Sequence, residues 1–154
     1  MTDHKDLGRR IAGVVVSVAT TLALGLSLAP AAHATVVLRG EMYRATNHSR
    51  MDRSQHRLKL DARMSAKARR HSVAMWRAGT LFHTSNVNVY LKGHRWSRWG
   101  ENVGTTTQGV PTLERAFMHS PEHRTNILNG TFKHVAIGAI HRGGNLWVTV
   151  FFYG

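Results

Sequence analysis

Histidine and glutamate residues are the main candidates for chemistry in this chain, and three of them lie in distinctive local sequences. His83 ends the segment Gly-Thr-Leu-Phe-His, Glu101 lies in Trp-Gly-Glu-Asn-Val-Gly, and His123 lies in Ser-Pro-Glu-His-Arg-Thr-Asn-Ile-Leu. Imidazole titrates near neutral pH, so it can exchange protons or, when neutral, bind a metal ion. A carboxylate can act as a general base or as a metal ligand. Each segment is weak evidence for a site when it is taken alone.

Other reactive groups are either absent or lack the motif that would mark them. The chain has no cysteine, which excludes disulfides, Cys-ligated zinc, iron–sulfur clusters and a thiol nucleophile. It contains no H-E-x-x-H, no G-x-S-x-G and no P-loop, so the common zinc-protease, serine-hydrolase and nucleotide-binding motifs are missing.

Two helices and a polar loop are predicted ahead of these segments. Residues 38–51 carry an apolar stripe at helical spacing, and the polar residues 52–59 are typical of a loop. A stronger helical pattern covers residues 61–78. Asp61 or Ser65 can cap its start, and Gly79 follows its end, as glycine commonly does.

The second half of the chain predicts a long loop, two short helices and a β-hairpin. Residues 80–109 are rich in Gly, Asn, Ser and Thr, and are predicted to be irregular. Short helices begin at Pro111 and at Ser120-Pro121, where Ser120 is the expected N-cap. Residues 135–140 and 146–153 are β-prone and flank Gly143-Gly144, a hairpin signal. Helices followed by such a hairpin predict an α+β domain.

The first 34 residues predict a secretory signal peptide. Lys5, Arg9 and Arg10 precede a charge-free apolar run from Ile11 to Ala29, and Ala32-His33-Ala34 provides a cleavage pattern. A transmembrane anchor is the alternative, but the run barely reaches spanning length and ends in that pattern. Cleavage after Ala34 would remove three cations and two anions, which lowers the net charge of +13 to +12.

In this order the segments resemble the CAP superfamily, named for cysteine-rich secretory proteins, antigen 5 and pathogenesis-related proteins. The likeness is to its secreted bacterial members with an SCP-like domain. Gly-Glu-Asn at 100–102 and Ser-Pro-x-His-Arg-x-Asn-Ile-Leu at 120–128 are the most specific motifs, and Asn47 and Arg50 match the family's N-x-x-R. The eukaryotic cysteines are absent. The resemblance implies a CAP domain over residues 35–154, folded as a three-layer α-β-α sandwich with a small antiparallel sheet.

The resemblance also implies a cleft that holds His83, Glu101 and His123. A fourth glutamate of many relatives has no counterpart, because neither Glu114 nor Glu122 matches its motif position. Two imidazoles and a carboxylate can bind a divalent cation such as zinc. With such a metal, or with Glu101 and His123 as acid–base groups, the cleft could catalyse hydrolysis. The same three groups can instead be hydrogen-bonded for a structural or substrate-orienting role, so enzyme activity is left open.

Neighbouring residues are expected to support this cleft. Four are predicted to anchor the loops around it: Asn102, Ser120, Arg124 and Asn126. His71 lies on the apolar stripe of the second helix, which favours a hydrogen-bonded core histidine over a ligand. Trp96 and Trp99 could stack on a sugar ring, line a lipid groove or pack as a lid.

The positive charge indicates where such a protein could adhere. A dense basic run extends from Arg50 to Arg70, either as a solvated face or as a patch for an anionic polymer. No nucleic-acid module is present, and export argues against DNA as a partner. Three hypotheses follow: a secreted or envelope-associated module, non-catalytic or weakly catalytic, with no membrane anchor after cleavage; a metal-dependent hydrolase; or a binder of lipids or anionic envelope polymers.

Overall fold

The computed structural model describes residues 29–154, so most of the predicted signal peptide, residues 1–28, lies outside the described residues. The rest of that segment, residues 29–34, forms the first turns of α1 (Ala29–Met51). Leu38 and Met42 are the first α1 side chains that pack in the main apolar cluster. Cleavage after Ala34 stays a prediction. No helix among the described residues is long and apolar enough to cross a membrane.

A four-stranded sheet forms the middle layer of the domain. Its order is β1 (Lys59–Leu60), β3 (His134–Arg142), β4 (Asn145–Tyr153) and β2 (Trp99–Thr106). β4 pairs antiparallel with both β3 and β2, whereas β1 pairs parallel with β3. The predicted α+β class is confirmed, and the sheet is mixed rather than purely antiparallel because of this short first strand.

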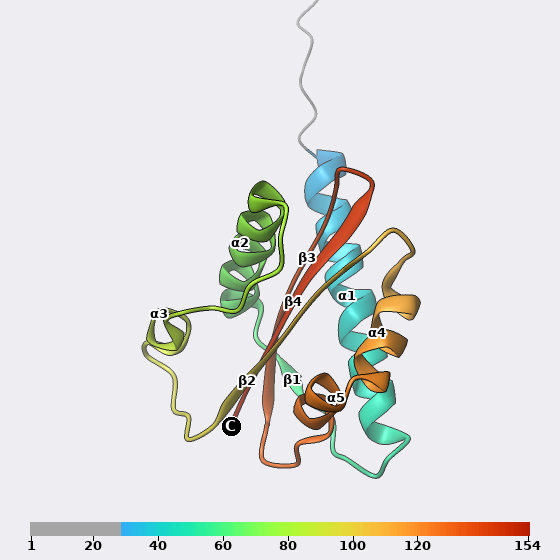
Figure 1. The fold of residues 1–154 in the computed structure, drawn as a ribbon. Helices are drawn as coiled ribbons and strands as arrows, with labels where there is room; N and C mark the ends of the chain where they lie inside the picture. The colour runs from blue at the N-terminus through green and yellow to red at the C-terminus, as the bar shows by residue number, and fades with distance from the viewer. Residues whose placement is uncertain (1–28) are drawn as a thin grey trace, which may run out of the picture.

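Helices cover both faces of the sheet, which confirms the three-layer arrangement. α2 (Ala62–Ala78) and the short α3 (Val87–Leu91) lie on one face. α1, α4 (Val110–His119) and α5 (Pro121–Leu128) lie on the other face, as Figure 1 shows.

β4 lies at the centre of both apolar layers because its side chains alternate between the two faces. Val148, Val150 and Phe152 belong to the main cluster, which α1, α4 and α5 cover. Trp147 and Phe151 belong to two smaller clusters on the α2 side. The hairpin strands are therefore buried on both faces, and they position β2 along one edge.

The ends of α2 and the turn of the hairpin agree with their sequence signals. Oδ1 of Asp61 accepts a hydrogen bond from the N–H of Met64 at 2.8 Å, which satisfies a free donor of the first turn. Gly79 ends α2 with a φ of 66°. Gly143 and Gly144 have φ values of 59° and 77°, the two positive values that a tight hairpin turn of type I′ requires.

The prediction that residues 80–109 are irregular is wrong for much of this stretch, because it contains α3 and all of β2. Local sequence predicts this strand poorly since two of its residues, Gly100 and Gly104, are glycines. β2 forms because each of its residues pairs with β4, which lies some forty residues further along the chain. β1 likewise begins at Lys59, the last residue of the predicted loop.

Candidate functional site

Glu101 and His83 form the hydrogen-bonded centre of the candidate site. The Glu101 side chain lies on β2 and is only 1% exposed, whereas that of His83 is 61% exposed. Oε2 of Glu101 accepts hydrogen bonds from Nδ1 of His83 at 2.8 Å and from the backbone N–H of Thr84 at 2.9 Å. Because a carboxylate only accepts, Nδ1 carries the proton and Nε2 of a neutral His83 keeps its lone pair. That lone pair is available to a ligand.

His71 of α2 lies on the buried side of the same carboxylate. Its Nε2 donates to the carbonyl oxygen of Phe82 at 2.8 Å and lies 3.9 Å from Oε1 of Glu101. Oε1 is buried and has no hydrogen-bond partner among the described residues. His71 is thus the hydrogen-bonded core histidine that its helical position predicts, and its proximity to Glu101 is visible only in the tertiary structure.

His123 of α5 borders the site from the other side of β2. Its ring packs against Phe117, with ring centroids 4.8 Å apart. Burial lowers the pKa of His123, and repulsion from the nearby His83 lowers it further, while the charge of Glu122 acts in the opposite direction. His123 is therefore mainly neutral at pH 7, the form that can accept a proton or bind a metal ion.

Three residues of the two motifs connect α5 to β2 and so position His123. Asn102 donates from Nδ2 to the carbonyl oxygen of His123 at 3.0 Å. Asn126 donates from Nδ2 to Oδ1 of Asn102 at 2.9 Å and to the carbonyl oxygen of Glu101 at 3.2 Å. A Cβ at Gly100 would lie 2.5 Å from Oδ1 of Asn126, so this close approach requires glycine. Because successive strand residues face opposite sides, Glu101 contacts the loop after α2 while Asn102 contacts α5.

The other two predicted anchors do not contact β2. Ser120 has the backbone conformation of an N-cap, but its hydroxyl donates to Oε2 of Glu122 at 3.0 Å rather than capping α5. Arg124 is exposed and lines an open groove of about 740 Å³ beside Arg53 and Leu128. The structure therefore assigns the connection between α5 and β2 to Asn102 and Asn126.

Neither of the two other nearby glutamates joins the site. Glu114 is buried between α4 and α1, where Oε2 accepts a hydrogen bond from Thr46 at 3.2 Å. Glu122 is exposed at the start of α5.

The arrangement offers two imidazole donors rather than a compact set of three ligands. Within residues 29–154, no three His, Asp or Glu side chains are grouped as a metal site. Glu101 uses Oε2 to hold His83, as carboxylates commonly do behind a metal-binding histidine. Nε2 of His83 and the ring of His123 are the candidate ligands for a cation, and Glu101 orients the ring of His83.

Known proteins are similar to this chain in sequence and in fold. The sequence model of the CAP family, described as the cysteine-rich secretory protein family, matches residues 43–153. The uncharacterized protein YkwD of Bacillus subtilis is 28% identical over 112 residues, which are 69% of this chain and 43% of that protein. The present chain thus spans less than half of that relative.

Solved structures give the same result for the fold. An extracellular protein containing an SCP domain from Bacillus anthracis aligns with 80% of this chain and 42% of its own, with a TM-score of 0.71 and 19% identity. A cysteine-rich secretory protein from Staphylococcus aureus aligns with 77% of this chain and 38% of its own, with a TM-score of 0.65 and 20% identity. An outer surface protein from Borrelia burgdorferi aligns with 75% of this chain and 92% of its own, with a TM-score of 0.66 and 14% identity. With its motifs, its fold and a family match over most of its length, this chain belongs to the CAP family of cysteine-rich secretory proteins.

Proposed function

We propose that this protein is an exported CAP module whose cleft binds a divalent cation such as zinc through His83 and His123. The observation that carries the proposal is the hydrogen bond from Nδ1 of His83 to the buried Glu101. This bond fixes the tautomer in which Nε2 can bind a metal ion, and it holds the imidazole ring in one orientation.

The role that we propose for the cleft is binding rather than catalysis. Glu101 is almost completely buried, so it cannot reach a substrate as a general base without a change in the structure. A bound cation would supply a Lewis acid that lowers the pKa of a bound water. Hydrolysis is the alternative, in which His123 would be the proton acceptor.

Calorimetric titration with zinc chloride tests the cation site. We expect the unmodified protein to bind zinc and the variant with both His83→Ala and His123→Ala to lose that binding. Glu101→Gln should weaken binding by about 10- to 100-fold, the usual effect of removing a carboxylate behind a metal ligand. A variant with both His119→Ala and His141→Ala is the matched control, because both residues are exposed. Unchanged binding in the His83/His123 variant would refute the site.

An assay of peptide hydrolysis with and without zinc separates binding from catalysis. We expect no zinc-dependent hydrolysis by the unmodified protein. Turnover that disappears in His123→Ala, while the thermal midpoint is retained, would favour the hydrolase hypothesis instead.

Export is proposed from the N-terminal sequence and from the kinds of protein that share the fold. The relatives are described as an extracellular protein, a cysteine-rich secretory protein and an outer surface protein. Residues 29–34 precede the packed part of α1, so cleavage after Ala34 would leave the core intact. Mass spectrometry of the protein recovered from a bacterial culture medium should find Thr35 as the first residue. An intact N-terminus on cell-bound protein would contradict the proposal.

Adhesion to an anionic envelope polymer is a second candidate, favoured by the unpaired cations. All ion pairs among the described residues join a histidine to a carboxylate, so no Lys or Arg there lies within 4.0 Å of an acidic group. α2 contains four arginines, one lysine and no acid. The prediction that the basic run from Arg50 to Arg70 lies on the surface is wrong for Arg50. Its side chain is buried and donates hydrogen bonds to the carbonyl oxygens of His56, Ile127 and Asn129.

Cosedimentation with bacterial envelopes at low and high salt tests this adhesion. Changing Arg69, Arg70 and Arg77 to Gln should reduce binding, and binding by the unmodified protein should weaken steeply as salt increases. A variant with Arg98→Gln, Arg115→Gln and Arg142→Gln, all outside α2, removes the same three charges and controls for net charge. Binding that does not depend on salt would refute the electrostatic model.

A further inference from the structure

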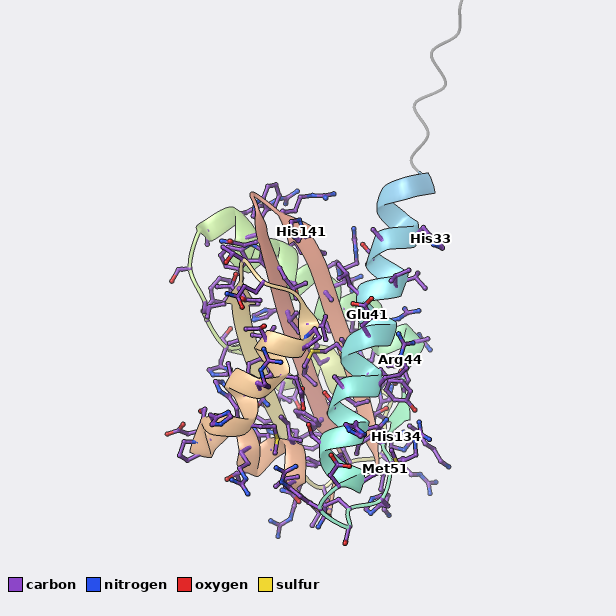
Figure 2. All side chains as sticks on the ribbon, turned by 90° about the vertical axis from the view of Figure 1, so that its right-hand side faces the viewer. His33, Glu41, Arg44, Met51, His134 and His141 are labelled. Atoms are coloured by element: carbon purple, nitrogen blue, oxygen red, sulfur yellow. The ribbon has the colours of Figure 1, made fainter. Side chains whose placement is uncertain are left out.

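A second concave site lies where the loop before β2 meets the start of β3. It is an open cavity of about 340 Å³, lined by Arg95, Trp96, Ser97, Lys133, His134 and Gly154. The cavity lies at the His134 end of β3, whereas His141 lies near the other end of that strand, as Figure 2 shows. None of the cleft residues lines this cavity, so it is separate from the candidate cation site.

The side chains of Arg95, Trp96 and Lys133 are unpaired in this cavity. Within residues 29–154, none of these side chains forms a hydrogen bond, an ion pair or a ring contact, and no Asp or Glu side chain lines the cavity. Trp96 is 37% exposed, whereas the neighbouring Trp99 stacks on Phe151 with ring centroids 5.6 Å apart. Two unpaired cations and a partly exposed indole therefore line the same cavity.

The floor of the cavity is held by an internal network. The ring of His134 stacks on that of Tyr153, with centroids 4.9 Å apart. The hydroxyl of Tyr153 donates to Oδ2 of Asp61 at 2.8 Å, and Nε2 of His94 lies 2.9 Å from the same oxygen. This network fixes the ring under His134, so a ligand would meet a formed surface.

The wall that carries Arg95 and Trp96 is fixed by backbone hydrogen bonds. A backbone carboxyl oxygen of Gly154 accepts hydrogen bonds from the N–H groups of Ser97 at 2.7 Å and Arg98 at 3.1 Å. On the opposite side, the N–H of Lys133 donates to the carbonyl oxygen of Tyr153 at 3.0 Å. Both walls are therefore attached to the end of β4.

We propose that this cavity binds a sugar ring that carries an anionic group, either a carboxylate or a phosphate. The face of Trp96 suits the C–H groups of a sugar ring, while Arg95 and Lys133 suit the anion. The volume is at the lower end of the range for small-molecule sites, and it fits one sugar residue better than a lipid chain. The proposal does not depend on cation binding at His83 and His123 or on the arginines of α2.

Calorimetry and amide chemical-shift mapping with four probes test the proposal. The probes are glucuronic acid, glucose 6-phosphate, glucose and inorganic phosphate. We expect both acidic sugars, or one of them, to bind with a dissociation constant on the order of 1 mM, since the ligand is small. The two acidic probes distinguish a carboxylate from a phosphate. Equal binding of inorganic phosphate and glucose 6-phosphate would overturn the role of Trp96, and no binding of either acidic sugar would overturn the proposal.

Variants locate the binding. Trp96→Ala, and separately Arg95→Gln with Lys133→Gln, should weaken binding of the acidic sugar by about tenfold or more. Lys92→Gln with Arg98→Gln is the matched control, because both are exposed cations of the same loop outside the cavity lining. All five side chains are exposed, so the thermal midpoint should be unchanged. Equal weakening in the control pair would show a general charge effect and refute the site.

Discussion

The two faces of the sheet hold their helices by different means. On the face covered by α1, α4 and α5, one large apolar cluster with bulky side chains such as Phe132 and Phe152 fills the space. On the α2 face the two apolar clusters are smaller. Ser72 of α2 also donates a hydrogen bond to the carbonyl oxygen of Gly138 in β3 at 3.1 Å. The first face therefore depends on side-chain volume, and the second on close backbone approach and hydrogen bonds.

The largest expected effect comes from removing volume on the α1 face. Phe152→Ala should lower the free energy of unfolding by about 3–5 kcal/mol, because it leaves a cavity in a fully packed cluster. Urea unfolding measures the change. Val89→Ala, at an exposed position, should stay within about 0.5 kcal/mol. A loss below about 1.5 kcal/mol for Phe152→Ala would show that this face does not depend on volume.

Adding volume should have the stronger effect on the α2 face. A Cβ at Gly138 would collide with backbone atoms of Ala68 and Arg69, which cannot move independently of α2. At Gly104, on the other face, a Cβ would lie 2.8 Å from the ends of the Leu113 and Phe117 side chains, which can shift. We expect Gly138→Ala to cost about 3 kcal/mol and Gly104→Ala about 1 kcal/mol in urea unfolding. The reverse order would contradict the comparison.

Two buried glutamates, one on each face, should respond in opposite directions to replacement by glutamine. Burial raises the pKa of Glu114, while hydrogen bonds from Ser49 and Thr46 only partly oppose this rise. Its charge therefore costs stability at pH 7, and Glu114→Gln should stabilise the protein by about 1 kcal/mol. Glu101 accepts two hydrogen bonds, so Glu101→Gln should destabilise it by about 1 kcal/mol.

The pH dependence of the Glu114 effect gives a further check. Because the pKa is raised in the folded state, the native protein binds this proton more tightly than the unfolded chain does. The cost appears as pH rises above the ordinary value of 4.5 and is complete above the raised pKa. The gain from Glu114→Gln should therefore shrink as pH falls toward 4, which urea unfolding across this range can measure. A gain that is independent of pH would indicate a packing effect instead.

The smallest expected effect is on the pH dependence of stability, through His123 of α5. Burial and the nearby His83 lower its pKa, so the folded state favours the neutral ring. This contribution to stability is present above the ordinary pKa of 6.5 and is lost as pH falls below it. The thermal midpoint should fall less between pH 7.5 and 5 in His123→Gln than in the unmodified protein. His141→Gln, at an exposed position, should follow the unmodified protein.

Several local features of the fold are readable from the chain because neighbouring residues determine them. The cap at Asp61, the left-handed Gly79 and the turn at Gly143-Gly144 each depend on the conformation of a few adjacent residues. The motifs around Glu101 and His123 were sufficient to predict the family, which the match over residues 43–153 confirms.

The site itself required contacts between distant segments. β2 becomes a strand by pairing with β4, and Glu101 reaches His83 and His71 only because α2 packs across that sheet. Arg50 is buried and donates a hydrogen bond to the carbonyl oxygen of Ile127 in α5, and a count of charged residues in the sequence does not predict this burial. Sequence alone determined which residue types could do chemistry, where α2 begins and ends, and where the final hairpin turns. The tertiary structure decided which of these residues meet, because pairing and packing energies depend on contacts that local propensity does not contain.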